Sequence, residues 1–337
     1  MSQERHKRLT LKDIAAKTGY SVITISKALR DGSDLADSTK KLIQETAQSM
    51  GYVANSAANA LRSGQTKTIA LTLVDISNPF WGCYAKKVDT IARSHGYTTM
   101  IMNTDMDGKR EEFAIRTAVE RGVDGLIIDP SVSYRSNVRI LEKFGIPFVI
   151  AGYIPNDISM DTVSFDEYQI AYLTAKRFLE KGRTELLMLN LPKGLPCTAI
   201  RAQGFLDALQ EAGLGPEHVS IANVDNIEGE CVRVLRRLME ERPAANGVFA
   251  YGDHRALEVA DELASLGLRI PEDVALIGSG TLKSYLRIPF SLTTTYSPPT
   301  LIAHEGTELL IRRMQGDMDP PSLHVKIPVH IVEGKSC

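Results

Sequence analysis

The sequence predicts a two-part protein, in which a small all-α helix-turn-helix headpiece precedes an α/β core of two doubly wound parallel-sheet lobes. Three observations lead to this fold class. Apolar residues recur at helical spacing near the start of the chain, apolar runs alternate with amphipathic stretches after Lys67, and that alternation occurs twice. The 337 residues are enough for the small unit and a two-lobed core of roughly 270 residues.

Two short helices are predicted on either side of a break at residues 18–20. Gly19 in this break can take a positive φ without steric cost, and Ser21 is a natural N-cap for the second helix. Ala15 is small enough to let the second helix cross closely. The apolar positions at helical spacing are Leu11, Ile14, Ala15, Val22, Ile25 and Leu29. Together these features predict a helix-turn-helix.

A third helix is predicted from Ser38, as its N-cap, to Met50, with Gly51 as its stop. A three-helix bundle of this kind can also be a structural unit that binds no DNA. The distribution of charge along the chain is therefore needed to decide between the two. Residues 1–67 hold 11 Lys and Arg against 6 Asp and Glu, whereas the remainder holds 28 against 35. The basic excess lies on the helical unit, which favours a DNA reader.

After Lys67, strands alternate with helices in two sets. The first set has TIALTLVD, YTTMIMNTD, GLIIDP and PFVIAG as strands, and the second has ELLMLN, VSIANV, GVFAYG and DVALIG. The helices between them are predicted at Phe80–His95, Lys109–Arg121, Arg201–Ala212, Gly229–Arg242 and Arg255–Leu266. This alternation predicts two parallel sheets with both faces covered, and ligands of such sheets bind at the carboxyl ends of the strands.

Four segments carry a resemblance to a known family. They are TLKDIAAKTGYSVITISKALRDG, GYVANSAANALRSGQTKTIALTLVDISNPFW, RAQGF at Arg201–Phe205 and LASLGLRIPEDVALIG at Leu263–Gly278. In this order and spacing they closely resemble the LacI/GalR family of bacterial transcriptional regulators. The resemblance implies a repressor with a periplasmic-binding-protein-like core, which binds a palindromic DNA operator as a homodimer and an effector between its lobes.

The resemblance also implies domain boundaries. Residues 1–54 form the DNA-binding headpiece, 55–67 a hinge helix and linker, and 68–337 the core. The N-lobe takes about 68–165 and 297–320, and the C-lobe about 166–296 and 321–337, with crossings near Phe165, Tyr296 and Pro320. Because the chain ends at Cys337 without a heptad segment, we expect a dimer rather than a tetramer.

Residues Asn55–Ser63 are expected to form the hinge helix. Asn55 can cap it, but a helix of under ten residues is marginal in water, so it is expected to fold when DNA is bound. The family resemblance makes Leu61 the side chain wedged between base pairs in the minor groove. Arg62 is then a backbone or minor-groove contact. The alternative is a linker that is merely rich in alanine.

The second helix carries the residues that the resemblance assigns to operator reading. Val22 and Ile23 take the discriminating positions, where apolar side chains favour thymine methyl groups. Ile23 has an alternative place in the bundle core. The other expected DNA contacts are Lys27 as a basic contact, Thr24 and Ser26 at phosphates or base edges, and Thr10 and Ser21 as backbone clamps.

The expected effector site departs from the family pattern. Gly152, Gly252 of the Gly252–Asp253 pair and Gly280 stand where many sugar-responsive members have polar residues. Arg201, Phe80 and Trp81 remain as ligand contacts. With Lys193 and Lys283 nearby, we expect a roomier, more positive cleft and an anionic effector such as a sugar acid or sugar phosphate. The alternatives are lost effector binding, or replacement contacts from Asp166, Tyr153 or Tyr251.

No enzyme, cofactor or metal site is expected. The first strand of the core ends in DISNPF rather than a glycine-rich phosphate loop, and the seven histidines lack paired ligand spacing. Cys83, Cys197, Cys231 and Cys337 are expected to be ordinary thiols of a reducing cytoplasm. No signal peptide or apolar span is found, so we expect a cytoplasmic, nucleoid-associated protein without membrane contact. The second hypothesis is a repressor controlled by a protein corepressor.

Overall fold

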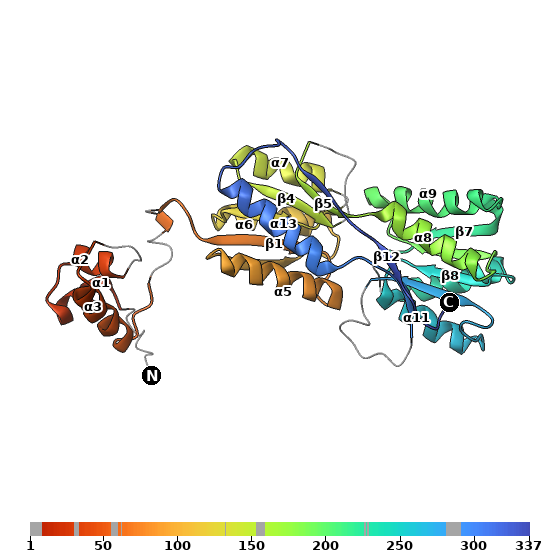
Figure 1. The fold of residues 1–337 in the computed structure, drawn as a ribbon, viewed down its shortest axis with the longest axis horizontal. Coiled ribbons are helices and arrows are strands. Elements are labelled where there is room, and N and C mark those ends of the chain that lie inside the picture. Colours follow the sequence, from red (N-terminus) through yellow and green to blue (C-terminus); the bar gives the residue numbers. More distant parts are fainter. Residues whose placement is uncertain are drawn as a thin grey trace. The chain divides into compact units, whose positions relative to one another are not determined.

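The computed structural model describes residues 9–29, 34–54, 60–61, 63–131, 133–152, 159–225, 227, 229–280 and 291–337. The chain divides into two compact units, Met1–Gly64 and Gln65–Cys337 (Figure 1). Within the described part of the chain, no helix has both the length and the apolar composition that a membrane crossing needs.

The first unit is a three-helix bundle of α1 (Leu11–Thr18), α2 (Val22–Ala28) and α3 (Asp37–Ser49). Thr10 caps α1, since its backbone N and its hydroxyl each donate to Asp13 Oδ2 at 2.7 Å. Gly19 has φ +78° at the turn, as expected. Its core consists of Ile14, Ile25, Ala28, Ile43 and Ala47. This confirms the predicted helix-turn-helix fold of the unit.

The start of α3 corrects one detail of the sequence analysis. The helix begins at Asp37 and its N-cap is Ala36, so Ser38 lies inside the first turn. Asp37 in that first turn stabilises the positive end of the helix dipole. The helix therefore starts without the side-chain cap that Ser38 was expected to supply.

The second unit contains two sheets, each with six strands in the described residues. The first has the order β11-β5-β4-β3-β1-β2 and is parallel throughout. Its strands are β1 (Thr68–Leu73), β2 (Thr98–Asn103), β3 (Gly125–Ile128), β4 (Phe148–Gly152), β5 (Thr162–Phe165) and β11 (His324–Ile327). Its helices are α5 (Pro79–Ser94), α6 (Gly108–Glu120), α7 (Tyr134–Phe144) and α13 (Pro299–Met314).

The second sheet has the order β12-β10-β9-β8-β6-β7, and its edge strand β12 is antiparallel to β10. Its strands are β6 (Leu186–Asn190), β7 (Val219–Asn223), β8 (Gly247–Ala250), β9 (Ala275–Ser279), β10 (Thr293–Tyr296) and β12 (His330–Val332). Its helices are α8 (Glu167–Glu180), α9 (Pro196–Glu211), the short 3₁₀ helix η1 (Pro216–His218), α10 (Glu230–Glu241) and α11 (Asp253–Ser265).

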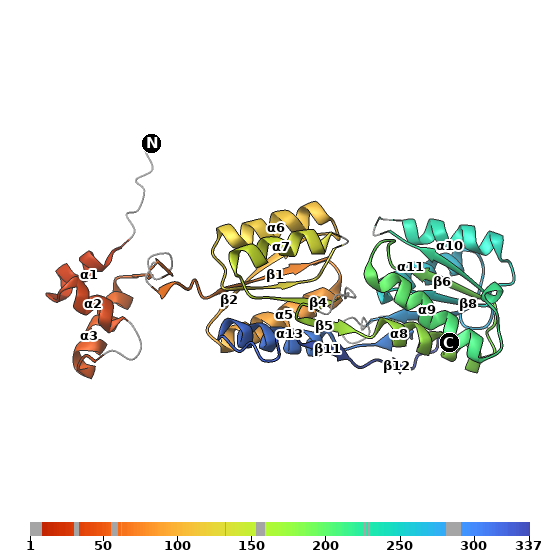
Figure 2. The same ribbon diagram turned by 90° about the horizontal axis from the view of Figure 1, so that it is seen from above.

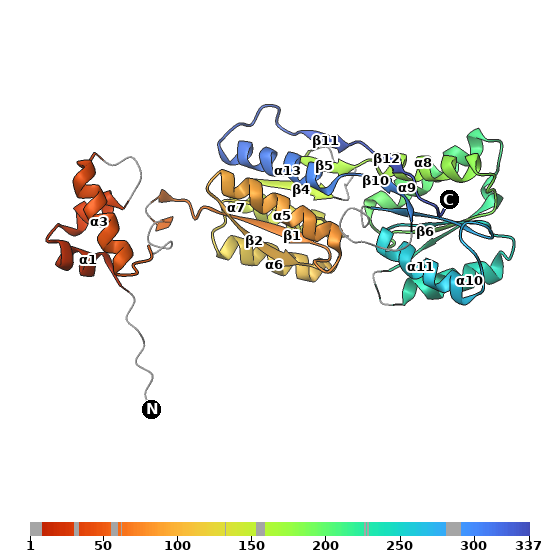
Figure 3. The same ribbon diagram turned by 60° about the horizontal axis from the view of Figure 1, so that its bottom comes forward.

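Both sheets are covered by helices on their two faces. In the first lobe α5 and α13 lie on one face and α6 and α7 on the other, as Figures 2 and 3 show. In the second lobe α8 and α9 cover one face and α10 and α11 the other. The central strands are accordingly buried along nearly their whole length, as in β1 and β6. The predicted pair of doubly wound lobes is confirmed.

One expected boundary is wrong. Residues 321–337 were assigned to the C-lobe, but β11 pairs with β5 in the first sheet, from His324↔Thr162 to Ile327↔Phe165. The chain therefore returns to the second lobe after Ile327 rather than near Pro320. The β11 strand has exposed residues between its more buried ones at a sheet edge, so it lacked the continuous apolar run that identified strands such as β1 and β6.

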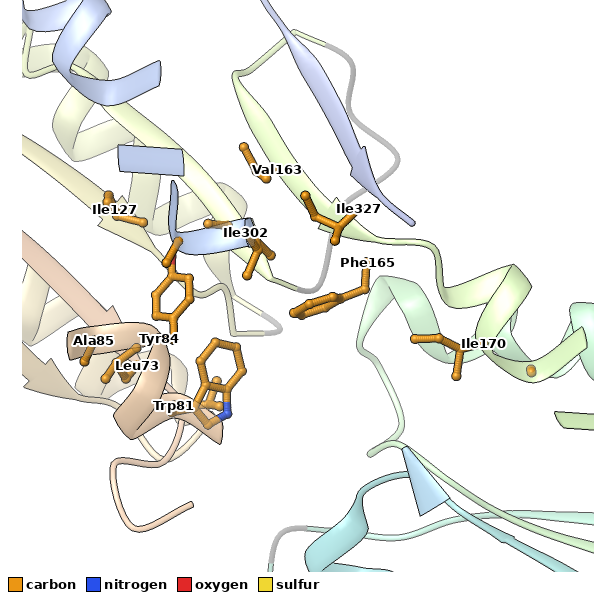
Figure 4. Packing of buried hydrophobic residues seen from close by; sticks show 14 of the residues in the cluster. Leu73, Trp81, Tyr84, Ala85, Ile127, Val163, Phe165, Ile170, Ile302 and Ile327 are labelled. Atoms are coloured by element: carbon orange, nitrogen blue, oxygen red, sulfur yellow. The ribbon is translucent and has the colours of Figure 1, made fainter. Parts of the chain in front are cut away.

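A continuous apolar core joins the two lobes. Phe165, at the end of β5, and Ile170, on α8, belong to the same cluster as Trp81 and Tyr84 of α5 (Figure 4). The Phe165 and Phe80 rings meet edge to face with centroids 5.6 Å apart. The chain crossing from β5 to α8 is thus packed with apolar side chains at the point where the lobes meet.

Candidate functional site

The exposed face of α2 carries apolar side chains. Ile23 is 72% exposed and Val22 38% exposed, while Ile25 of the same helix is fully buried. The alternative that places Ile23 in the bundle core is therefore wrong. A large apolar side chain kept in water on a short helix leaves surface that a DNA groove or another partner can cover.

Polar residues near Val22 and Ile23 already form hydrogen bonds or an ion pair within the protein. The Ser21 hydroxyl accepts a hydrogen bond from Thr24 N at 3.1 Å and lies 2.9 Å from the Thr24 hydroxyl. Lys27 Nζ lies 3.3 Å from Asp34 Oδ1, and this contact lowers the pKa of Asp34. Ser26 is half-buried. The residues predicted to read base edges in the major groove thus share one short helix, α2, with Ser21 as its N-cap.

Leu61 is 90% exposed. Gly64 N donates to Ala60 O at 2.8 Å, which is a helical turn around this residue. The predicted contacts Asn55 and Arg62 lie outside the described residues.

A cavity that is open to solvent lies between the two lobes, at the carboxyl ends of the strands, and its empty space is about 790 Å³ with the open solvent included. Its described lining residues are Val74, Asp75, Asn78, Phe80, Trp81, Met106, Phe165, Glu167, Ile170, Arg201, Tyr251, Gly252, Asp253, His254, Ser279, Gly280, Thr295 and Ser297. Among the residues that the structure describes, no group of three His, Cys, Asp or Glu side chains is placed to hold a metal ion.

Arg201 forms a buried ion pair with Glu167. The side chains are 2% and 5% exposed, and Arg201 Nε donates to Glu167 Oε2 at 2.6 Å. Arg201 Nη1 also donates to the Tyr251 carbonyl oxygen at 3.2 Å. Burial raises the pKa of Glu167, and the contact with Arg201 opposes that rise. Position 201 was predicted to bind the ligand, and its charge is already balanced by the protein.

Two of the glycines predicted to have lost polar contacts lie against carboxylates. A Cβ added at Gly280 would lie 3.4 Å from Asp253 Oδ2, and one at Gly152 would lie 2.4 Å from Asp129 Oδ1. Asp253 is 3% exposed and accepts a hydrogen bond from the Thr294 hydroxyl at 2.5 Å. The negative charge expected to be missing at these glycines is therefore supplied from neighbouring elements.

His254 and Asn78 bring the two lobes together at the cavity. His254 Nδ1 lies 3.5 Å from Asn78 Nδ2, the N-cap side chain of α5. Burial, assisted by the nearby Arg255, lowers the pKa of His254 to about 4, although Asp75 acts in the opposite direction. His254 is thus neutral at pH 7 and adds no positive charge to the cavity.

Aromatic side chains form the apolar part of the lining. Phe80 and Trp81 meet edge to face with ring centroids 5.0 Å apart, and Trp81 meets Tyr84 at 5.5 Å. Phe165 completes this group from the crossing strand (Figure 4). Such faces pack against the C–H groups of a small ligand while the polar residues orient it.

Known proteins resemble this chain in sequence and in fold. Residues 175–337 match the family model described as a periplasmic binding protein-like domain. The transcriptional repressor PurR of Aliivibrio salmonicida is 26% identical over 309 residues, which cover 91% of this chain and 92% of PurR. A LacI transcriptional regulator of Alkaliphilus metalliredigens, solved in complex with D-xylulofuranose, is 26% identical with a TM-score of 0.70, over 80% of this chain and 98% of that one.

Over most of its length the chain is therefore similar to transcriptional regulators of the LacI family. The fold agrees along the whole length, since the Lac repressor dimer bound to operator superimposes with a TM-score of 0.84 at 17% identity. That match covers 98% of this chain and 99% of the Lac repressor chain.

The chain gathers most of the predicted effector residues at one cleft. Phe80, Trp81, Arg201, Gly252, Asp253 and Gly280 line it. Gly152 lies behind Trp81, whose ring would be 3.5 Å from a Cβ there. Asp166 does not line the cavity, because its carboxylate caps α8 through Gln169 N at 3.1 Å. Tyr251 does line it, whereas Tyr153 and Lys283 lie outside the described residues.

The described lining does not supply the positive charge that was expected of the cleft, and Lys283 lies outside the described residues. Asp75, Glu167 and Asp253 line the cavity, and Arg201 is the one lysine or arginine among its described lining residues. Lys193 is exposed and is not part of this lining. Glycines in place of acids suggested a positive cleft, but other segments contribute acids to it, among them Asp75 at the end of a predicted strand.

Proposed function

We propose that this LacI-family regulator is a repressor that binds a near-palindromic operator as a homodimer and changes its operator affinity when a small polyhydroxylated ligand occupies the cleft. One observation carries the proposal. The same chain combines a short helix whose Val22 and Ile23 face solvent with an open cavity between two lobes. A ligand that favours one arrangement of the lobes then shifts the population able to bind DNA.

The α2 surface supports a mode of operator reading. Val22 and Ile23 offer methyl groups to thymine methyl groups in the major groove. The Lys27–Asp34 pair is exposed, so it is worth little and its lysine is free to exchange Asp34 for DNA. Thr10 and Ser21 are the N-caps of α1 and α2, and we infer that these helix starts contact the phosphate backbone. Leu61 supplies the minor-groove wedge, with Asn55 and Arg62 beside it in sequence.

The cleft supports a polyhydroxylated ligand. Carboxylates accept hydrogen bonds from hydroxyl groups, Arg201 and Asn78 carry N–H groups, and Phe80 and Trp81 offer apolar ring surfaces. D-xylulofuranose, the ligand of the Alkaliphilus relative, has this chemistry. An anionic sugar acid or phosphate is disfavoured, since it would meet Asp75 and Asp253 without a free cation among the described lining residues.

A second copy of the chain is the partner that we propose for the first lobe's edge. Strand β2 ends the sheet and leaves Ile101 40% exposed, while Phe113 on α6 is 73% exposed. A long edge strand with exposed apolar side chains is a ready pairing surface. A two-fold dimer would carry two reading helices, one for each half-site of a palindromic operator, and the Lac repressor with the same fold is a dimer on its operator.

We infer that the cleft binds its ligand without catalysis. Its charged groups are held by the protein itself, with Arg201 on Glu167 and Asp253 on Thr294. Neutral His254 has its Nδ1 near the Asn78 amide. A bound ligand should therefore be recovered unchanged. No cofactor is part of this proposal.

Operator binding is the experiment that tests the proposal. Purified protein is titrated with genomic fragments from upstream of its own gene, at near-physiological salt, with and without a panel of neutral, amino and acidic sugars. We expect one fragment to bind at least about 10³-fold more tightly than random DNA, and one ligand to shift that affinity. Equal affinity for random DNA contradicts operator reading. Specific binding that no ligand shifts contradicts control through the cleft and favours a protein corepressor.

A further inference from the structure

One carboxylate holds the linker where it enters the core. Asp124 lies between α6 and β3, and Thr66 N donates to its Oδ1 at 2.9 Å while Lys67 N donates to its Oδ2 at 2.8 Å. The Thr66 hydroxyl lies 2.8 Å from Gly122 O and 3.3 Å from Asp124 Oδ1. Hydrogen bonds from N–H groups to a carboxylate are charge-assisted and stronger than neutral ones. Asp124, Thr66 and Lys67 therefore form a firm attachment, the linker clamp.

The backbone of Lys67 gives a second indication. Its φ is +53°, which is uncommon for a residue with a Cβ and costs free energy. Contacts beyond Asp124 hold it there, since its carbonyl oxygen accepts from Thr98 N at 2.9 Å and its ammonium lies 4.7 Å from the centre of the Tyr97 ring. Such strain persists only where the surroundings fix the residue, and it is concentrated at functional sites.

The linker clamp and the cleft lie at opposite ends of the same strands. The chain enters the first lobe along β1, which starts at Thr68 beside the clamp and is followed by Val74 and Asp75 in the cavity lining (Figure 1). Strand β3 starts directly after Asp124 and is parallel to β1. Residues 69–73 of β1 are fully buried, and a close-packed interior is hard to compress and transmits strain. A displacement of the first lobe at the cleft therefore reaches the clamp.

Resting on the function proposed above, we propose that Asp124 is a positioning residue that couples the ligand cleft to operator binding. It fixes the linker to the first lobe, so that a displacement caused by the ligand moves the start of the linker by the same amount. Without the clamp, residues 66 and 67 absorb that displacement by rotation about their backbone bonds. The ligand still binds, but the two lobe arrangements no longer differ in operator affinity, and that difference is the coupling.

Fluorescence anisotropy on the full-length protein at pH 7 tests this proposal. The DNA probes are the genomic fragment that wild type binds most tightly and random DNA of the same length. The ligand probes are D-xylulose, D-ribose, D-glucosamine and D-gluconate. The measured quantity is the ratio of operator affinities with and without the sugar that acts most strongly on wild type. In Asp124→Ala we expect at most the square root of the wild-type ratio, so that half or more of the coupling free energy is lost, while affinities for that sugar and for random DNA change less than twofold.

Variants at Thr66 supply an independent comparison. Thr66→Val keeps the shape of the side chain but loses the hydroxyl contacts with Gly122 and Asp124, so its ratio should also fall. Thr66→Ser keeps the hydroxyl and should keep the wild-type ratio. This pair decides the matter if Asp124→Ala does not fold.

The matched control is Asp273→Ala. The Asp273 carboxylate accepts from Arg269 N at 2.9 Å and from Arg269 Nε at 2.8 Å, within the second lobe, and does not line the cavity. Its loss removes bonds of the same kind without touching the linker, so the ratio should equal that of wild type.

Two outcomes overturn the proposal. Folded Asp124→Ala or Thr66→Val keeps the wild-type ratio, or the ratio falls as far in Asp273→Ala, which would assign the effect to lost stability. The proposed function fails separately, when wild type binds no fragment specifically or when no sugar shifts its operator affinity. In that case there is no coupling for Asp124 to carry.

Discussion

The Asp129 carboxylate fills the space that a side chain at Gly152 would need, since a Cβ at residue 152 would lie 2.4 Å from Asp129 Oδ1. The glycine also has φ +127°, a conformation that L side chains rarely adopt. Asp129 Oδ2 accepts from Val74 N at 3.3 Å, and the charge of Asp129 contributes to raising the pKa of buried Tyr84. Strand β4 therefore ends in a residue without a side chain, because the carboxylate of Asp129, which follows β3, lies against it.

The variant Gly152→Ala should be destabilised by about 2–4 kcal/mol, because backbone strain adds to a clash with a buried carboxylate. Thermal unfolding of the purified protein measures this. The control is Gly213→Ala, which has φ +77° and nothing within 4 Å of an added Cβ, so it pays for strain alone at about 1 kcal/mol. If the unfolding temperature falls by the same amount in both variants, the clash between a residue 152 side chain and Asp129 is contradicted.

The variant Glu167→Gln should lose about 3–5 kcal/mol of stability, because it leaves the guanidinium of Arg201 buried without its anion. Urea unfolding measures the loss. Glu211→Gln is the control, since Glu211 is an exposed acceptor for the Tyr172 hydroxyl and its change should stay within about 0.5 kcal/mol.

The change at the partner residue, Arg201→Met, should lower the free energy of unfolding less at acid pH than at pH 8. Burial already raises the pKa of Glu167, and without Arg201 nothing on that side chain opposes the rise. A raised carboxyl pKa in the folded state means that the folded protein holds the proton more tightly, so stability falls as pH rises through the unfolded value. If Arg201→Met lowers the free energy of unfolding by the same amount relative to wild type at pH 5 and at pH 8, this explanation through the pKa of Glu167 is contradicted.

His254 should make the core less stable in mild acid. Its folded pKa of about 4 lies below the unfolded value of 6.5, so the unfolded chain takes up the proton first. The contribution is complete above pH 6.5 and is lost as pH falls toward 4, to a total of about 3 kcal/mol. Urea unfolding at pH 7 and pH 4.5 should show a smaller acid loss in His254→Gln than in wild type. His304→Gln, at an exposed position of α13, should keep the wild-type loss; if His254→Gln keeps it too, this interpretation is wrong.

The fold was predictable where its signals are local. The spacing of Ile14 and Ile25 and the positive φ of Gly19 place the first two helices, and continuous apolar runs place strands such as β1 and β6. Strands β5, β10, β11 and β12 were not predicted; β11 and β12 lie at sheet edges, and an edge strand needs no such run. Helix α9 begins at Pro196, five residues before the predicted start, since proline suits a first helical turn.

The charge of the cleft was not predictable, because it depends on residues that are distant in sequence. Glu167 and Arg201 are 34 residues apart, and the sequence shows an arginine but not its partner. Asp129 replaces a carboxylate at Gly152 from a neighbouring strand. A glycine in place of an acidic residue does not indicate that the site has lost a negative charge when another element brings a carboxylate to the same position.

Leu61→Ala tests the proposed wedge most directly, because Leu61 is 90% exposed and its truncation should leave the stability of the unit unchanged. Specific operator affinity should fall at least tenfold, since the side chain no longer supports the kinked DNA, while affinity for random DNA should change less than twofold. Fluorescence anisotropy on both DNAs measures this, and energy transfer across the operator should report a smaller bend. Val53→Ala removes an exposed side chain of the same unit, 69% exposed, and should change neither affinity. An equal loss on both DNAs would mean that Leu61 contributes to general contact with the duplex and does not act as a wedge.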